Sequence, residues 1–502
     1  MKNKVFYLFL ILNMCFFYPG KAQKSLIPHN NVWNVTDFEA KGDGKTLNTI
    51  AFQQAIDNCA ALGGGIVNVS AGCYVIGTIF LRNNVQLHIE PGAELLGSPN
   101  KQDYVPIPQK AGLEDKFFLI FAENAEHVSI TGMGKINGNG DAFWHKEMLS
   151  EFVRKPKSWR PSGLIGFVNC RFFAINDVLL KNSPCYTLWA LGCEDLKING
   201  ITIRNAIDGP NTDGIDIDCC RRVLITNCNI EGGDDAIAIK SDSGRLGETR
   251  PCEDIIVSNC ILSSPPACGI RVGYEGDSPI RDCIFQNLTI RNSNHGINVI
   301  SVLPNPNYPC AIFEGTKIEN IQFNNIIMHN VTQPIYMWMG NEKPDKPFGG
   351  YMKNISISNL TATNVGNSFI GSMLEEKSIE DITLSNIKLF PGKSISENTY
   401  VNVWGSCHPY VLYAKNVSGL HINELAVDFS STKEIWQHAL HFENASDIRL
   451  NLFSAIKAER IPLKHLIFAE NSVLQISGNS YKNRKSHFFL KKDSMSKIDI
   501  KN

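Results

Sequence analysis

Two acidic segments contain the residue types that acid/base chemistry requires. The first, residues 211–218, contains Asp213, and the second, residues 232–240, contains Asp234 and Asp235 side by side. Asp213 and Asp235 each stand just before a short apolar run, 22 residues apart. If those runs form neighbouring strands about 4.8 Å apart, the three carboxylates crowd one patch, and crowding raises the pKa of at least one of them. The sequence therefore predicts acid/base catalysis by these aspartates.

Two other interpretations of the same patch stay open. Closely spaced oxygen ligands also suit Ca²⁺, and aspartates in turns are commonly just solvated. We favour catalysis, because a structural protein has little reason to bring like charges together.

Internal repetition indicates the architecture that holds these segments. A pattern of alternating apolar residues followed by Asn or a substitute recurs, centred on positions 200, 227, 259, 287, 325, 359, 386 and 424. One copy cannot bury its own apolar face, whereas stacked copies share a continuous core. Asn at the same bend of successive copies predicts a ladder of side-chain hydrogen bonds. The predicted fold is all-β: a single-stranded right-handed parallel β-helix. A leucine-rich solenoid, the alternative, would need many Leu at fixed spacing.

The start of the chain has a different pattern. An apolar-periodic stretch follows Thr49 and ends at Gly63, which predicts one amphipathic helix, capped by Thr49, over the first coil. We expect a β-helix catalytic domain over residues 23–480 and a Lys-rich surface tail over residues 481–502.

Residues 1–22 have the pattern of a secretory signal peptide. A positively charged start precedes an apolar run over residues 5–18, and small residues follow at positions 20 and 22. An N-terminal membrane anchor is the alternative, although the run is short for a spanning helix. We expect an exported protein, in the periplasm, at the cell surface or outside the cell, with no membrane span after processing.

Composition excludes several classes of protein. The chain has 502 residues, of which 43% are hydrophobic, so general disorder is excluded. Lys and Arg number 48 against 49 Asp and Glu, so the near-neutral chain has no broad basic surface for nucleic acid. Cys193, Cys220 and Cys252 occupy equivalent repeat positions, which favours small buried hydrophobes, with disulfide pairing left open.

The two acidic motifs resemble signatures of a known family. Residues 211–213 (Asn-Thr-Asp) and 233–235 (Gly-Asp-Asp) resemble those of glycoside hydrolase family 28, the polygalacturonases and related pectin hydrolases. The resemblance implies that Asp234 is the general acid, and that Asp213 and Asp235 are bases activating a water with inversion at the anomeric carbon. It also implies an acidic plant polysaccharide (pectin) as partner, and neither a metal nor an organic cofactor. We expect a monomer.

Two further signatures of the family are absent. The Gly-His-Gly signature reads Ala-Cys-Gly at residues 267–269, and the cationic Arg-Ile-Lys signature reads Asn-Val-Ile at residues 298–300. Aligning the strands places His295 one coil after the missing His, and Arg271 one coil before the missing Arg. We expect these two residues to replace them, with Arg271 binding a uronate carboxylate through two hydrogen bonds. A structural histidine and a surface salt bridge are the alternatives.

Three more residues are candidate substrate contacts. Asn211 begins the first acidic motif, and Lys240 projects from the same strand as Asp235. Lys240 could bind an acidic sugar or pair with Asp218. Tyr336 could stack on a sugar ring, although aromatic residues in a solenoid are more often buried in a ladder.

The sequence thus favours a secreted, inverting, polygalacturonase-like hydrolase of α-galacturonosidic linkages. Within that class, a rhamnogalacturonan hydrolase or an exo-acting galacturonidase is the alternative, because the cationic signatures are absent. A calcium-assisted polysaccharide lyase and a non-catalytic carbohydrate-binding β-helix are alternatives from other classes.

Overall fold

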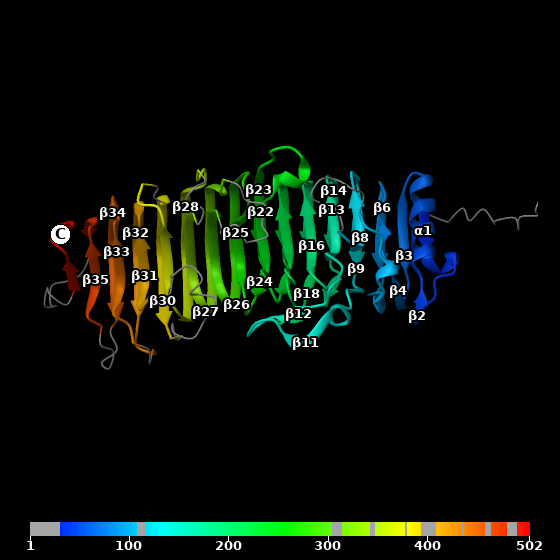
Figure 1. The fold of residues 1–502 in the computed structure, drawn as a ribbon, viewed down its shortest axis with the longest axis horizontal. Coiled ribbons are helices and arrows are strands. Elements are labelled where there is room, and N and C mark those ends of the chain that lie inside the picture. Colours follow the sequence, from blue (N-terminus) through cyan, green and yellow to red (C-terminus); the bar gives the residue numbers. More distant parts are fainter. Residues whose placement is uncertain are drawn as a thin grey trace, which may run out of the picture.

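The chain winds into a long parallel β-helix, in which 36 strands of the described residues form one continuous sheet (Figure 1). The computed structural model describes residues 31–107, 116–303, 314–341, 347–376, 379–392, 408–432, 435–456, 463–478 and 489–501. The predicted signal peptide, residues 1–22, lies outside them. The predicted parallel β-helix is confirmed.

Each coil adds one strand to each of three parallel ladders. The first ladder contains β5 (Ile79–Phe80), β8 (Phe118–Glu123), β13 (Gly163–Val168), β16 (Tyr186–Leu191), β19 (Ile215–Asp218), β22 (Ile237–Ser241), β25 (Cys268–Gly276), β29 (Ser368–Ser372), β31 (Tyr410–Lys415), β33 (His438–Glu443), β35 (His465–Glu470) and β37 (Leu490–Lys492).

The second ladder contains β1 (Val32–Asn34), β3 (Gly65–Val69), β6 (Val85–Ile89), β9 (Ser129–Gly132), β14 (Arg171–Asn176), β17 (Glu194–Asn199), β20 (Arg221–Thr226), β23 (Cys252–Ser258), β28 (Tyr351–Val365), β30 (Ile379–Pro391), β32 (Val417–Asp428), β34 (Ile448–Ile456), β36 (Val473–Ser477) and β38 (Lys497–Lys501).

The third ladder contains β2 (Asp43–Leu47), β4 (Gly72–Ile76), β7 (Ala93–Gly97), β10 (Lys135–Asn137), β15 (Leu179–Lys181), β18 (Thr202–Arg204), β21 (Asn229–Glu231) and β24 (Ile261–Ser263). The long strands β26 (Pro279–Leu303) and β27 (Lys317–Asn341) run through all three ladders, and the C-terminal halves of β28, β30, β32 and β34 continue the third ladder. An antiparallel pair, β11 (Trp144–Met148) and β12 (Arg154–Pro156), projects from the side (Figure 1).

Stacked apolar side chains fix the register of the coils. In the first ladder Ile215, Ile237, Ile270 and Ile297 occupy one column inside the β-helix, and all four are fully buried. Because side chains of a strand alternate between its faces, the residue that follows each isoleucine points outward. The core therefore fixes which side chains face the site.

A helix closes the N-terminal end, as predicted. The helix α1 (Thr49–Ala61) buries Phe52, Ile56 and Cys59 against the first coil. The cap differs by one residue, because Asn48 is the N-cap, and its side chain makes no capping hydrogen bond. The Thr49 hydroxyl instead accepts a hydrogen bond of 2.7 Å from the backbone amide of Gly77 and ties the helix to the next segment.

The predicted asparagine ladder is present at one bend of the second ladder. Asn227 donates to Asn199 at 2.8 Å, Asn287 to Asn259 at 3.1 Å, and Asn325 to Asn287 at 2.8 Å. The backbone of Asn227, Asn287 and Asn325 has φ near +55°, a conformation that Asn tolerates better than most residues. Asn therefore both adopts the positive-φ conformation of the bend and forms the side-chain hydrogen bond between coils.

The cysteines also match the prediction. The twelve cysteines among the described residues are all free, and eleven of them are buried. The backbone amide of Cys193 donates to the Cys220 sulfur at 3.2 Å, one coil away. The thiols therefore fill the core and bond to backbone, as predicted for small buried hydrophobes.

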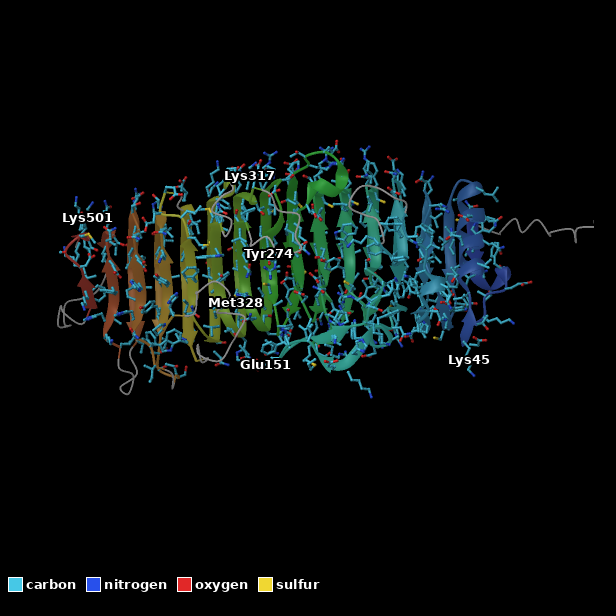
Figure 2. The ribbon with its side chains drawn as sticks, in the orientation of Figure 1. Lys45, Glu151, Tyr274, Lys317, Met328 and Lys501 are labelled. Carbon is cyan, nitrogen blue, oxygen red and sulfur yellow. The ribbon has the colours of Figure 1, made fainter. Side chains whose placement is uncertain are left out.

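The C-terminal segment differs from the predicted surface tail. Strands β37 and β38 pair in parallel with β35 and β36, so the ladders continue to Lys501. Within the described ranges, no helix has the length and apolar character needed to cross a membrane. Tyr274, on β25, lies near the middle of the β-helix, far from both Lys45 and Lys501 (Figure 2).

Candidate active site

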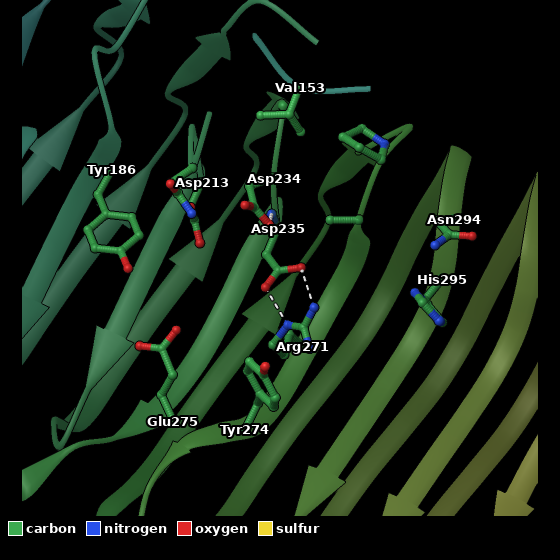
Figure 3. A pocket seen from close by; sticks show the side chains of 14 residues that line it. Val153, Tyr186, Asp213, Asp234, Asp235, Arg271, Tyr274, Glu275, Asn294 and His295 are labelled. Atoms are coloured by element: carbon green, nitrogen blue, oxygen red, sulfur yellow. Dashed lines mark hydrogen bonds and ion pairs between the residues drawn. The ribbon is translucent and has the colours of Figure 1, made fainter. Parts of the chain in front are cut away.

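A pocket of about 220 Å³ opens on the outer face of the first ladder. It contains six of the residues predicted from sequence, and these are Asn211, Asp213, Asp234, Asp235, Arg271 and His295. The pocket also contains Val153, Tyr186, Tyr274, Glu275 and Asn294, whose side chains Figure 3 shows around the same space. The structure therefore brings both acidic motifs to one place.

Backbone pairing sets the two motifs side by side. The amide of Gly214 donates to the Asp235 carbonyl at 2.8 Å, so Asp213 and Asp235 stand level on consecutive coils, as predicted. The buried Thr212 hydroxyl accepts a hydrogen bond of 3.0 Å from the Gly233 amide. A Cβ at Gly233 would lie 2.4 Å from the Ala206 carbonyl oxygen, so only glycine fits there.

The three carboxylates converge. One oxygen each of Asp213, Asp234 and Asp235 lies within 4.8 Å of the other two. Burial, followed by the neighbouring charges of Asp213 and Asp235, raises the pKa of Asp234 well above its ordinary value. The raised pKa favours the protonated form of Asp234, which is the form a general acid requires.

Arg271 shifts the pKa of Asp235 in the opposite direction to that of Asp234. Its Nε donates to one Asp235 oxygen, and its Nη2 donates to the other at 3.2 Å (Figure 3). The Cys268 amide adds a third hydrogen bond of 3.2 Å. Burial alone would raise the pKa of Asp235, but the Arg271 guanidinium lowers it below the ordinary value. Asp235 is therefore ionised, as a general base must be.

Asp213 resembles Asp234, and not Asp235, in the direction of its pKa shift. It is 3% exposed, and its Oδ1 has no hydrogen-bond partner. Burial, followed by the charge of Asp216, raises the pKa of Asp213 well above its ordinary value. The pKa values of the two aspartates that the family resemblance pairs as bases are therefore shifted in opposite directions.

Lys240 lies beneath the pocket, in a network of carboxylates. Its Nζ is 2.8 Å from Asp216, 3.2 Å from Glu275 and 3.7 Å from Asp213. The side chain is 2% exposed and lies over the Tyr186 ring, with Nζ 4.7 Å from the ring centre. Burial lowers the pKa of Lys240, but the surrounding carboxylates raise it well above its ordinary value. Lys240 is therefore an internal counter-ion rather than a sugar ligand.

Lys240→Met is expected to lower the free energy of unfolding at neutral pH by about 3–5 kcal/mol, because it leaves buried carboxylates without a cation. Denaturant unfolding monitored by circular dichroism would measure this. Lys353→Met is the matched control: the exposed Lys353 forms an ion pair at 3.0 Å with the partly buried Glu319 on the surface of the β-helix, so stability should change much less. Equal effects of the two substitutions would contradict the role of Lys240.

Arg271 and His295 occupy the predicted columns but differ from the predicted roles. Cys268 pairs with His295, and Arg271 with Asn298, as the strand alignment required. The structure disfavours the prediction that Arg271 binds a uronate carboxylate, because the Arg271 guanidinium already donates hydrogen bonds to both carboxylate oxygens of Asp235. Burial, followed by the Arg271 charge, lowers the pKa of His295 to about 3, so this imidazole is neutral. It stands 3.7 Å from the Cys268 sulfur.

Asn211 lies at the rim, and Tyr336 lies behind the pocket lining, with its ring centre 4.9 Å from that of His295. The Asn211 side-chain oxygen accepts a hydrogen bond of 2.8 Å from Arg160. Tyr336 is 1% exposed and packs in an aromatic cluster with Trp338, Phe369 and others. The prediction that Tyr336 contacts the sugar is therefore not supported, and the alternative, a buried aromatic, describes it.

A β-bulge supplies two pocket residues that sequence reasoning missed. Strand β25 pairs Val272 with Ile239 and Gly276 with Ser241, so β25 has two more residues than β22 over this interval. The bulge turns Tyr274, with φ of +76°, and Glu275 into the pocket. The glycines at 273 and 276 were the available signal, because glycine inside a strand commonly marks a bulge.

The carboxylate cluster is also close enough to hold a cation. The charge of Arg271 disfavours cation binding. Its guanidinium already neutralises Asp235 through both carboxylate oxygens, and it would repel a divalent ion bound there. The arrangement is better suited to proton transfer, since the pKa values of two neighbouring carboxyl groups are shifted in opposite directions.

A parallel β-helix whose outer pocket holds one carboxyl group with a raised pKa beside one with a lowered pKa has the parts of a glycoside hydrolase. Residues 108–407 match the profile of Glycosyl hydrolases family 28, more than half of the chain, and the protein belongs to this family. Residues 32–145 match the family described as Rhamnogalacturonase A/epimerase, pectate lyase-like.

Several proteins that are similar to this chain are named as polygalacturonases. A probable polygalacturonase of Vitis vinifera is 31% identical over 280 residues, which cover 53% of this chain and 56% of that protein. An endo-polygalacturonase of Pectobacterium parmentieri is 26% identical, over 70% of this chain and 85% of its own length. The crystal structure of an exopolygalacturonase from Thermotoga maritima superposes with a TM-score of 0.61 at 25% identity, over 72% of this chain and 87% of that one.

Proposed function

We propose that this protein hydrolyses α-galacturonosidic linkages in pectin by acid/base catalysis. Asp234 protonates the glycosidic oxygen, and Asp235 takes a proton from the attacking water. The observation that carries the proposal is the convergence of the three carboxyl groups in one pocket, where burial raises the pKa of Asp234 and the Arg271 ion pair lowers that of Asp235. Asp213, which lines the same pocket, is close enough to help orient the water.

We propose inversion at the anomeric carbon. The closest oxygens of the carboxylate cluster lie within 4.8 Å, nearer than the roughly 6.5–9.5 Å typical of the two groups in inverting enzymes. Asp235 nevertheless suits a base better than a nucleophile, because Arg271 binds both of its oxygens and withdraws charge from each. It can still accept a proton from water.

Hydrolysis is expected to give reducing ends without ultraviolet-absorbing unsaturated products, and to persist in a chelator. Reducing-sugar release from homogalacturonan and from rhamnogalacturonan backbone, with and without chelator, would measure this. Proton NMR of the product formed first would show the β anomer if α linkages are cut with inversion. Unsaturated products that vanish with chelator would support a calcium-assisted lyase instead.

The setting of this activity is part of the proposal. The signal-like residues 1–22 support export, to the periplasm, the cell surface or the medium. A monomer acting on a polymeric substrate is consistent with a pocket formed within one chain. Whether attack is internal or at chain ends would follow from the size of the first products by mass spectrometry.

A further inference from the structure

The described pocket offers a charged sugar no uncommitted cation among its lining residues. Asp213, Asp234, Asp235 and Glu275 contribute four carboxyl groups, and Arg271 is the one Lys or Arg among the described lining residues. The raised pKa values of Asp213 and Asp234 favour their neutral forms, while Asp235 pairs with Arg271 and Glu275 pairs with Lys240. These charges are balanced within the protein, so the carboxylate of a uronate would stay unpaired in a partly buried pocket, which is costly.

Arg160, at the rim, donates to the Asn211 side chain and to the carbonyls of Pro184 and Pro210. The two cations next to the carboxyl groups, Arg271 and Lys240, are already engaged by protein carboxylates. Arg271 donates from Nε and Nη2 to the two oxygens of Asp235, as the dashed lines in Figure 3 show. Lys240 is 2% exposed and lies 2.8 Å from Asp216 and 3.2 Å from Glu275. A uronate could recruit either cation only by breaking an ion pair inside the protein, which would leave a buried carboxylate uncompensated.

The strand positions that match the missing cationic signature offer no replacement. Asn298 is 1% exposed and Ile300 is fully buried, and neither lines the pocket. One coil earlier, the bulge of β25 presents Glu275 instead, and its side chain is 24% exposed. Where a cation could contact the sugar, this chain places an anion that accepts hydrogen bonds from hydroxyl groups.

The remaining lining residues suit an uncharged ring. Tyr186 and Tyr274 present aromatic groups to the pocket, and the Arg271 guanidinium lies 5.2 Å from the centre of the Tyr274 ring. Aromatic groups pack against the apolar C–H face of a sugar, while carboxylates accept from its hydroxyls. Neither interaction needs a charge on the sugar.

We propose that the sugar seated in this pocket is uncharged: a pyranose with free hydroxyl groups and no ionised carboxylate on its ring. The inference rests on the proposed function and narrows its substrate. Two constituents of pectin share this chemistry: galacturonate whose carboxyl group is methyl-esterified, and a neutral sugar such as rhamnose that alternates with galacturonate.

Three polymers test the inference on the full-length protein: de-esterified homogalacturonan, its highly methyl-esterified form, and rhamnogalacturonan backbone. We expect kcat/KM, measured by reducing ends at low salt, to be about tenfold or more higher on one of the latter two than on the first. Preference for the esterified polymer identifies methyl galacturonate as the occupant, and preference for rhamnogalacturonan identifies the neutral sugar.

Glu275→Gln removes a negative charge from the pocket lining and frees Lys240 from one of its carboxylate partners, so a uronate meets a more favourable local charge. It is expected to raise kcat/KM on de-esterified homogalacturonan about three- to tenfold relative to the preferred polymer, and added salt should shrink the difference between wild type and variant. Glu380→Gln is the matched control, because Glu380 is exposed on β30 and outside the pocket lining. That substitution should leave the ratio unchanged.

Inhibition of the wild-type protein needs no variant and would decide the matter if Glu275→Gln fails to fold. Methyl galacturonate or rhamnose should inhibit about tenfold more strongly than galacturonate. Equal or faster cleavage of de-esterified homogalacturonan, together with galacturonate as the strongest inhibitor, would overturn the inference and leave the proposed function standing. Release of reducing ends from none of the three polymers would overturn the proposed function itself.

Discussion

Asp234→Asn is expected to lower kcat/KM on the preferred pectic polymer by about 100- to 10,000-fold. Asparagine has nearly the same shape as the protonated carboxyl group but cannot give a proton to the glycosidic oxygen. Stability should be unchanged or slightly higher, because the substitution removes an acid whose raised pKa reflects burial and two neighbouring carboxylates. Initial rates of reducing-sugar release, with a thermal unfolding curve for each protein, would measure both effects.

Asp381→Asn is the matched control for this prediction. Asp381 is exposed on β30 and has φ of +53°, a conformation that Asn also adopts, so the same chemical change is made outside the pocket. Its activity should equal that of wild type. If Asp234→Asn also kept wild-type activity, Asp234 would not be the acid, and a non-catalytic carbohydrate-binding β-helix would become the better explanation.

The fold was predictable because its signals are local and repeated. Each bend needs a residue that tolerates positive φ, and each coil needs apolar residues at alternate positions, so the pattern around Asn227, Asn259 and Asn287 indicates the stacking directly. The alignment of these repeats also placed Asp213 level with Asp235. In a solenoid, residues at equivalent positions of successive repeats lie next to each other in space. The repeat spacing therefore predicted that the two motifs are adjacent.

The parts that sequence did not predict depend on contacts between coils. Which residue pairs with Arg271 depends on the direction in which its side chain points toward the neighbouring coil. The sequence could not show that the guanidinium binds the Asp235 carboxylate. Glu275 reaches the pocket only because two extra residues bulge out of β25. The burial of Tyr336 results from packing among outward-facing aromatic side chains of other coils, which its own strand pattern does not reveal.

The ion pair between Arg271 and Asp235 leads to the second large prediction. Arg271→Gln is expected to move the acidic limb of the kcat/KM profile upward by about 1–3 pH units. Asp235 has a lowered pKa because of Arg271, so without the guanidinium it takes up a proton at higher pH and is lost as a base. Activity should therefore fall about ten- to a thousandfold in acid and recover as pH rises. Profiles of kcat/KM from about pH 3 to about pH 8 would measure this.

The same pair makes a matching contribution to stability, and the sign follows from the direction of the pKa. A carboxyl group whose pKa is lowered on folding stabilises the native state above its unfolded pKa, near 3.9, and that contribution disappears as pH falls through the folded pKa. At neutral pH, Arg271→Gln leaves the buried Asp235 charge unpaired, at a cost of about 3–5 kcal/mol in the free energy of unfolding. In acid the cost should shrink, because the orphaned carboxyl group becomes neutral.

Arg271→Lys separates charge from geometry. Lysine keeps the positive charge but cannot make the two parallel hydrogen bonds, so the acidic limb should move less than in Arg271→Gln, while kcat still falls because Asp235 is held less firmly. If both substitutions instead raised KM on charged substrates and left the pH profile in place, Arg271 would bind the substrate carboxylate, as the sequence first indicated. The pH profile and KM therefore assign Arg271 either to the catalytic base or to the sugar.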